Sequence, residues 1–341
     1  MKRFRWNGLL QTLLLCLICG TALAQGEPVS EPVSEPVNES ASEPVSAPES
    51  ETPDAPPAPF VPSGVQTLGG LNLWQDVFFF QEWRIQYNIL LKYHRLLDPQ
   101  SVQLAFGTLQ QCRDALERLK VERAIPPMRG RVLVLLHGFA SNRLTMQNMA
   151  CWFRRRGNYT AVVNITYPSM WLRVDEEVKT IASIVQQLEG VERIDFIGHS
   201  LGALVLRSFL SKTEDSRIGR LVQLCPPNQG ADVARMAGQA QISQNLSSGL
   251  VELMRDGDEM LRYFGIPKCP FGIIAGGTGD DKGYSSFLPG DDDGAVSVAA
   301  TLLDGSADFL LIPDKDHAEI PNCVEAFEAS EQFLNTGKFA K

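Results

Sequence analysis

The sequence predicts an α/β protein with a mostly parallel central sheet and helices on both faces. Short, continuously apolar segments recur along the chain, as in strands buried on both faces of a parallel sheet. These segments are 132–136, 161–165, 194–197, 221–224, 271–275 and 309–312. Stretches with helical spacing of apolar residues separate most of them, and such alternation is typical of a parallel sheet covered by helices.

Composition fits a folded protein and argues against one class of function. The 341 residues are 44% apolar and 21% charged, with a formal net charge of −9. Residues 25–62 contain eight acidic residues and no basic one, whereas the region that follows is nearly balanced. No basic stripe is available to neutralise phosphates, so we do not expect nucleic acid as a partner.

The first 24 residues have the layout of a secretory signal peptide. Three basic residues precede a Leu-rich segment at 9–18, and the small-residue pattern Ala-Leu-Ala follows at 22–24. An uncleaved membrane anchor is the weaker alternative, because Gly20 and Thr21 interrupt an apolar run that is shorter than the ~20 residues needed to span a bilayer. We therefore expect a periplasmic or secreted protein.

Residues 25–64 are expected to be a disordered linker. Glu-Pro-Val-Ser repeats open this segment, and ten of the 21 prolines lie between 25 and 62. Such a sequence buries too little apolar surface to fold and forms a semi-rigid, acidic spacer. This spacer either keeps the protein at a distance from a membrane or envelope surface or has no specific role. Residues 65–341 are predicted to form one domain.

The predicted domain begins with an antiparallel hairpin formed by residues 83–87 and 93–97, with an amphipathic helix as the alternative. Thr108 and Gln111 form a capping box for a helix that ends before Pro126. A second helix is predicted over 174–188, with three acidic residues in its first turn.

The strongest signal for chemistry is Gly198-His199-Ser200-Leu201-Gly202, between a buried strand and an apolar helix. This G-x-S-x-G pattern is typical of a nucleophile elbow, in which a sharp strand-to-helix turn presents the serine hydroxyl above the sheet. Glycines flank the turn because a side chain there would collide with the neighbouring strand and helix. Ser200 is therefore the candidate nucleophile.

A serine nucleophile needs a general base, and only four histidines are present: His94, His137, His199 and His317. In this arrangement the acid and then the histidine follow the serine along the chain. Only His317 lies after Ser200, in a loop behind the strand 309–312. We predict that His317 is the general base.

The acid should lie between these two residues and after a strand. Asp291-Asp292-Asp293-Gly294 offers three carboxylates, and we select Asp293 because the following glycine allows a sharp turn toward His317. Asp292 is the second choice, and a solvated acidic loop or a calcium site is the alternative interpretation. No spacing typical of histidine metal ligands occurs, so neither a catalytic metal nor another cofactor is expected.

Two backbone N–H groups are candidates for an oxyanion hole. One belongs to Leu201, directly after the nucleophile, and the other to Phe139, in the loop after the strand 132–136. Gly138 leaves room for close approach.

Together, the segment 137–139, the elbow 198–202, Asp293 and His317 resemble the α/β-hydrolase superfamily, in its lipase- and esterase-like branch. Leu224-Cys-Pro-Pro-Asn-Gln-Gly230 is similar to a P-x-x-G loop that many such lipases carry. The resemblance covers about residues 131–335. It implies attack of Ser200 on an acyl carbonyl, proton transfer through His317, and hydrolysis of an acyl-enzyme by water.

The insertion 231–266 carries the prediction for the substrate. Members of the superfamily often build a lid or acyl pocket here, and we assign Met236, Leu250 and Met254 to substrate binding. Ordinary helix packing is the alternative explanation for these residues.

The resulting prediction is an exported serine hydrolase of carboxylic acyl esters, lipids included, with a small-molecule or lipid ester as its partner. Two alternatives stay open at this point. The same residues could hydrolyse a thioester or amide, or the chain could be a catalytically silent scaffold that binds partners in the envelope.

Overall fold

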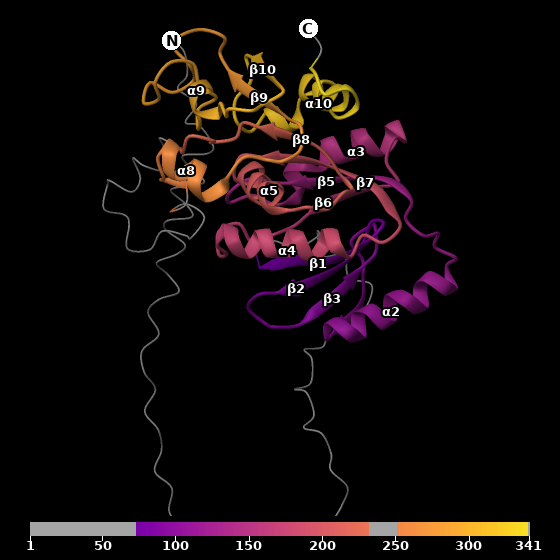
Figure 1. The fold of residues 1–341 in the computed structure, drawn as a ribbon. Coiled ribbons are helices and arrows are strands. Elements are labelled where there is room, and N and C mark those ends of the chain that lie inside the picture. Colours follow the sequence, from indigo (N-terminus) through magenta and orange to yellow (C-terminus); the bar gives the residue numbers. More distant parts are fainter. Residues whose placement is uncertain (1–72, 232–250, 252, 340–341) are drawn as a thin grey trace, which may run out of the picture.

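The computed structural model describes residues 73–231, 251 and 253–339 (Figure 1). The predicted signal peptide 1–24 and the predicted linker 25–64 lie outside these residues. None of the helices in the described ranges is long and apolar enough to cross a membrane.

A six-stranded, fully parallel sheet forms the centre of the protein, in the order β10-β9-β8-β7-β5-β6. Its strands contain all six of the predicted apolar segments. They are β5 (Gly130–Leu136), β6 (Ala161–Ile165), β7 (Val191–His199), β8 (Ile218–Leu224), β9 (Phe271–Gly277) and β10 (Asp308–Pro313). The predicted fold class is thereby confirmed.

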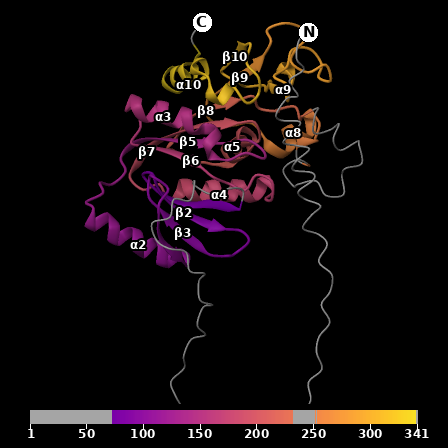
Figure 2. The same ribbon diagram turned by 180° about the vertical axis from the view of Figure 1, so that it is seen from behind.

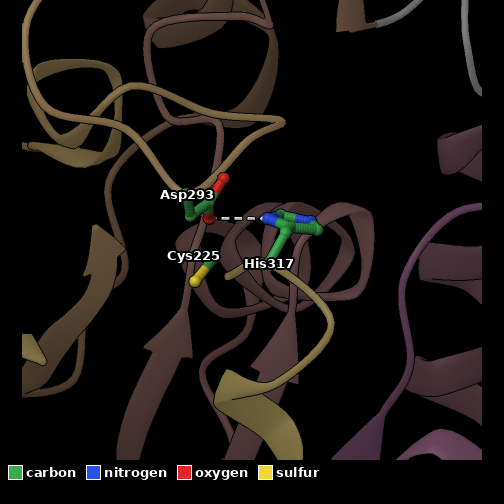
Figure 3. A group of neighbouring side chains, drawn as sticks. All are labelled: Cys225, Asp293 and His317. Carbon is green, nitrogen blue, oxygen red and sulfur yellow. Dashed lines mark hydrogen bonds and ion pairs between the residues drawn. The ribbon is translucent and has the colours of Figure 1, made fainter. Parts of the chain in front are cut away.

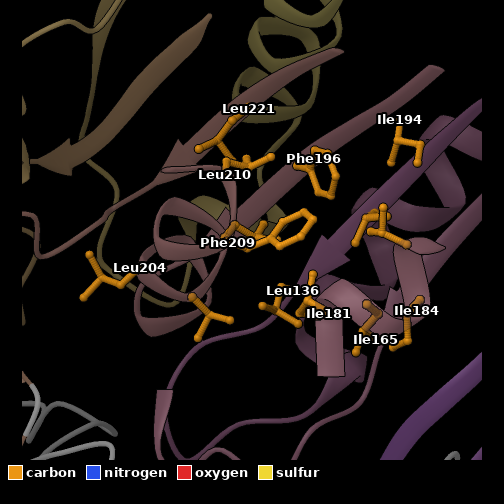
Figure 4. Close-up of a cluster of buried hydrophobic side chains, with 14 of the residues drawn as sticks. Leu136, Ile165, Ile181, Ile184, Ile194, Phe196, Leu204, Phe209, Leu210 and Leu221 are labelled. Carbon is orange, nitrogen blue, oxygen red and sulfur yellow. The ribbon is translucent and has the colours of Figure 1, made fainter. Parts of the chain in front are cut away.

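Helices cover both faces of this sheet (Figure 1). The bounds of the helices around the sheet are α3 (Gln147–Arg156), α4 (Val174–Gln186), α5 (Leu201–Lys212), α8 (Gly257–Phe264), α9 (Val298–Thr301) and α10 (Val324–Thr336), with short 3₁₀ helices η1 (Arg143–Met146) and η3 (Ile320–Asn322). Apolar residues of α4, α5 and α8 join one core cluster, part of which is drawn in Figure 4. Those of α3 and α10 join a second cluster on the opposite face.

The two clusters explain why the strands are continuously apolar. In β5, Val132, Val134 and Leu136 belong to the first cluster, whereas Leu133 and Leu135 belong to the second. Successive side chains of a strand point to opposite faces, so a sheet buried on both faces needs an apolar residue at every position.

A smaller antiparallel sheet precedes the parallel one, with strands in the order β1-β2-β3-β4. Its strands are β1 (Trp74–Phe80), β2 (Trp83–Asn88), β3 (His94–Leu97) and β4 (Gln103–Gly107). The predicted hairpin is confirmed as β2 and β3. The capping box is present too: Gln111 N donates to Thr108 Oγ1 over 3.2 Å at the start of α2 (Leu109–Glu122).

Buried polar contacts attach this small sheet to the β6 edge of the large one. Thr166 N donates to Asp76 Oδ2 over 2.6 Å, and Asp76 N donates to Thr166 O over 2.9 Å. Arg84 Nη1 donates both to Asp76 Oδ2 and to Asn164 O, over 3.3 and 3.1 Å. Figure 2 shows the small sheet and α2 beyond α4, on the side of the molecule away from α9 and α10.

Candidate active site

Ser200 occupies the turn between β7, which ends at His199, and α5, which begins at Leu201. Its backbone has φ 53° and ψ −122°, a positive φ that is uncommon for a residue other than glycine. A methyl group on Gly198 would lie 2.6 Å from Ala203 Cα, and one on Gly202 would lie 2.3 Å from His137 O. The strained turn and the two required glycines are the geometry expected of a nucleophile elbow.

His317 and Asp293 are brought together from loops after β10 and β9 (Figure 3). His317 Nδ1 and Asp293 Oδ2 are 2.7 Å apart, and His317 N donates to Asp293 O over 2.9 Å. Both residues are buried, with 7% and 1% of their surface exposed. Two bonds thus fix the imidazole relative to the carboxylate.

Backbone contacts distinguish the three adjacent aspartates. Asp293 Oδ1 accepts from the N–H groups of Ala295 and Val296, over 3.0 and 2.8 Å, which leaves Oδ2 for His317. Asp292 is directed elsewhere and accepts from Ser285 N and Gly294 N. These bonds make Asp292 a structural residue of the loop.

Asp291 has a third arrangement. It accepts from Thr278 N over 2.8 Å and from Gly279 N over 3.0 Å, and so closes the turn after β9. Its carboxylate is therefore directed at the loop backbone and away from His317.

The charges of the His317–Asp293 pair stabilise each other. Burial alone would lower the pKa of His317, but the charge and hydrogen bond of Asp293 raise it above the ordinary value of 6.5. Burial alone would raise the pKa of Asp293, but His317 and the two backbone N–H groups hold it below 3.8. A carboxylate beside an imidazole that gains a proton readily suits general-base chemistry.

Two other histidines near Ser200 stay neutral. Burial lowers the pKa of His137 to about 4 and that of His199 to about 3. His199 Nε2 lies 3.0 Å from His317 O, and because a carbonyl only accepts, this nitrogen carries the proton. His199 therefore joins the elbow to the histidine loop, a positioning contact that the sequence did not indicate.

Ser200 and His317 lie on adjacent segments, since the rings of His199 and His317 are 4.7 Å apart. No hydrogen bond joins Ser200 Oγ to His317 Nε2 within the part of the chain that the structure describes. Contacts of this kind in ligand-free enzymes are often long and tighten only when substrate binds.

The predicted oxyanion loop packs directly against the elbow. A methyl group on Gly138 would lie 3.1 Å from Ser200 Cβ and 3.2 Å from His199 Nδ1, so a larger residue would fit only if these neighbours moved by a few tenths of an ångström. Tyr167 stabilises this loop through two contacts with His137. Its hydroxyl donates to His137 O over 2.8 Å, and its ring stacks on His137 with centroids 4.3 Å apart. Tyr167 lies just past the end of β6, which is the only sequence signal that could have drawn attention to it.

The predicted substrate-binding residues are mostly not placed. Met236 and Leu250 lie outside the described residues. Met254 is half-buried and packs against the first core cluster. Its role in substrate binding stays a prediction.

The described ends of the insertion are tied to the elbow helix by a buried arginine. On α5, Arg207 donates to Asn228 O over 3.1 Å and to Gly265 O over 2.7 Å. These two acceptors lie near the start and the end of the insertion. A surface cavity of about 290 Å³ near Arg217 and Pro270 is at the opposite edge of the sheet and is unrelated to this site.

Comparisons with known proteins agree with the observed fold. The sequence model of the palmitoyl protein thioesterase family matches residues 132–257, which include the elbow. The propeptide form of the lipase BlEst2 from Bacillus licheniformis shares 18% identity and a TM-score of 0.51, over 61% of this chain and 51% of that one. None of the curated protein sequences matches the chain significantly.

Two further solved structures are more distant. The product of the gene lin2722 from Listeria innocua shares 14% identity, with a TM-score of 0.44 over 62% of this chain and 96% of that one. Phospholipase PlaB from Legionella pneumophila shares 16% identity, with a TM-score of 0.41 over 50% of this chain and 44% of that one. The matched region thus spans only about half of the propeptide form of the lipase and of the phospholipase.

The parallel sheet and the likeness to the BlEst2 lipase show that the chain has the α/β-hydrolase fold. Its sequence is similar to the palmitoyl protein thioesterase family over residues 132–257, and its fold is similar to that of the BlEst2 lipase.

Proposed function

We propose that the protein is a serine hydrolase that cleaves carboxylic acyl esters, lipid esters included. The observation that carries the proposal is the buried His317–Asp293 pair, 2.7 Å from nitrogen to oxygen, beside the strained turn that carries Ser200. The Leu and Met residues of the insertion and the lipase-like fold favour an acyl substrate.

In the proposed reaction, Ser200 Oγ attacks the acyl carbonyl while His317 Nε2 takes its proton. The Asp293 carboxylate stabilises the imidazolium that forms. The N–H groups of Leu201 and Phe139 stabilise the oxyanion, and His317 then protonates the leaving alcohol. Water hydrolyses the acyl-enzyme by the same steps and regenerates the serine.

The location of the reaction is part of the proposal. The basic, Leu-rich and Ala-Leu-Ala pattern of residues 1–24 supports export with cleavage of a signal peptide. The acidic, proline-rich linker supports action near a membrane or envelope surface.

A thioester substrate is the second candidate function, and the match to the palmitoyl protein thioesterase family favours it. The residues proposed for ester cleavage would have the same roles in thioester cleavage, because both reactions pass through the same attack by serine, the same oxyanion and the same acyl-enzyme. Only the leaving group differs: a thiolate is a better leaving group than an alkoxide and depends less on protonation by His317.

The two candidates are separated by matched substrates with the same acyl group on oxygen, sulfur and nitrogen leaving groups. Nitrophenyl esters from acetate to palmitate give the acyl preference. We expect ester hydrolysis by the full chain and its loss in Ser200→Ala. Faster turnover of every thioester, relative to its uncatalysed rate, would favour the second candidate. If no substrate is hydrolysed, the protein is better explained as a catalytically silent scaffold.

A further inference from the structure

Cys225 is a buried thiol beside the His317–Asp293 pair that the proposed reaction does not use (Figure 3). It follows β8 directly, with φ 47°, and its N–H donates to Ile274 O over 2.8 Å. The Cys225 sulfur, an Asp293 carboxylate oxygen and a His317 ring nitrogen all lie within 4.8 Å of one another. The strained backbone after β8 thus holds a third potential ligand beside the pair.

We propose that Cys225, Asp293 and His317 form a binding site for Zn²⁺, and that occupancy of this site inhibits the hydrolase. The existence of the site is independent of the proposed function, whereas inhibition rests on it.

The donor set selects the ion. Zinc takes thiolate, imidazole and carboxylate ligands in a tetrahedral arrangement, and three protein ligands leave the fourth position for water. Ca²⁺ and Mg²⁺ require six or more oxygen ligands, of which this cluster supplies a single carboxylate.

Charge also favours a divalent ion here. A thiolate and a carboxylate together balance the two positive charges of zinc, and the imidazole is neutral. The complex is therefore neutral overall, which reduces the cost of placing an ion among residues that are 0%, 1% and 7% exposed. His317 and Ser200 keep the small exposed fraction through which an ion would enter.

Occupancy would separate the pair and change the tautomer of His317. Two ligands on a tetrahedral zinc with bonds of about 2.0–2.1 Å lie roughly 3.3 Å apart. The present Nδ1–Oδ2 distance is 2.7 Å, so the hydrogen bond must break. With zinc on Nδ1, the neutral ring keeps its proton on Nε2. That nitrogen can then no longer accept the proton of Ser200, which accounts for inhibition.

Zinc binding is tested without activity, by competition of the full chain with a chromophoric chelator. We expect one tightly bound Zn²⁺ per chain in the wild type and at least about tenfold weaker binding in Cys225→Ser, since even the loss of an outer partner costs 10–100-fold. Cys112→Ser is the matched control, because Cys112 is also fully buried but lies in α2, remote from the site. Equal affinity in Cys225→Ser and wild type would overturn the proposal.

A second measurement needs no variant. X-ray absorption at the zinc edge of the loaded wild type should show one sulfur ligand at about 2.3 Å together with nitrogen and oxygen ligands. Cobalt in place of zinc should give a thiolate-to-metal charge-transfer band. A shell of oxygen and nitrogen alone, or no stoichiometric binding, would contradict the site.

Failure of the site and failure of the proposed function give different results. If both hold, zinc lowers the ester or thioester hydrolysis rate of the wild type, a chelator restores it, and Cys225→Ser needs at least about tenfold more zinc for the same fractional loss of its own rate. Zinc bound through sulfur in a protein without hydrolase activity would contradict the function alone. Hydrolysis that persists without stoichiometric zinc binding would contradict the site alone.

Discussion

Asp291, Asp292 and Asp293 have identical side chains and different surroundings. Only Asp293 has one oxygen held by backbone N–H groups and the other free to meet a histidine. Asp292 is equally buried, but its oxygens are used to order residues 283–294. The backbone around each carboxylate, more than its position in the acidic run, determines its role.

Replacement of Asp293 should therefore affect a different property of the protein from replacement of Asp292. Asp293→Asn should lower kcat by about 10⁴-fold, because the amide cannot hold the tautomer or stabilise the imidazolium. Asp292→Asn should instead lower the free energy of unfolding by roughly 1–3 kcal/mol, because one of its acceptors is lost. Steady-state kinetics and denaturant unfolding of both variants test this. A larger loss of kcat in Asp292→Asn would reverse the assignment.

The pH dependence of the reaction should report His317. A general base works only in its neutral form, so kcat/KM should rise with pH as His317 loses its proton. Since Asp293 raises the pKa of His317, the midpoint of this rise should lie above 6.5. His137 and His199, with pKa values of about 4 and 3, should not contribute at this pH. A midpoint below 6.5 with a soluble short-chain ester would contradict the pairing.

At the scale of elements, the turn from β7 to α5 depends on the absence of a side chain at Gly202. A Cβ there would meet His137 O at 2.3 Å and Leu136 O at 2.6 Å. Both obstacles are backbone atoms of the strand end that precedes the oxyanion loop. The same close packing therefore positions the nucleophile and the predicted oxyanion donors.

Gly202→Ala should consequently lower both stability and activity. We expect a loss of roughly 3 kcal/mol or more in the free energy of unfolding and at least about 10²-fold in kcat, comparable to removal of an oxyanion donor. Gly157→Ala is the control. It has φ 72° but no atom within 4 Å of the added methyl, so it should cost only about 1–2 kcal/mol and leave kcat unchanged. Equal effects of the two substitutions would show that the clash at Gly202 does not matter.

Some strands and helices could be predicted from the sequence, and others could not. The six parallel strands were predicted because each contains a continuous apolar run, although the edge strand β10 is only partly buried, and α2 was predicted because Thr108 and Gln111 form its cap. β1 was missed because its pairing with β2 has an irregularity between Asp76 and Phe78, which breaks the alternation of apolar and polar residues. β4 is five residues long and mostly half-buried, so it carries little hydrophobic signal.

For the whole molecule, buried polar contacts join the antiparallel sheet to the domain built on the parallel sheet. Glu177, on the first turn of α4, is 2% exposed, and Gln75 Nε2 on β1 donates to it over 3.4 Å. Burial raises the pKa of Glu177 to about 8, against an ordinary value of 4.5. Its carboxyl is therefore protonated in the folded protein at neutral pH and charged in the unfolded chain.

This difference makes stability depend on pH in a defined direction. Between pH 4.5 and about 8 the folded state binds one more proton here than the unfolded state, so this residue lowers stability as pH rises. Glu177→Gln should remove this loss of stability. The free energy of unfolding of the variant should therefore exceed that of the wild type by an amount that grows with pH, to a few kcal/mol in order of magnitude at pH 8. Denaturant unfolding at pH 5 and 8 measures it, with the exposed Glu189→Gln as control. A difference independent of pH would contradict the explanation.

The candidate site shows the limit of inference from sequence at this scale. Ser200, Asp293 and His317 could be selected because each follows a strand, and parallel strands bring their carboxyl ends to one edge of the sheet. Cys225 and Tyr167 also follow strands, but their contacts depend on how loops far apart in the chain pack together. Cys225 lies in the P-x-x-G-like segment 224–230, but that motif assigns the cysteine no role, and Tyr167 has no local motif. Only the three-dimensional arrangement could reveal what the two residues contact.

The central claim is that Ser200 is a nucleophile activated by His317. Its most direct measurement is labelling of the folded full chain with a fluorophosphonate, followed by peptide mapping of the modified residue. We expect one adduct, on Ser200, that is absent in Ser200→Ala and forms far more slowly in His317→Ala. An unlabelled wild type, or an adduct on another residue that persists in Ser200→Ala, would contradict it.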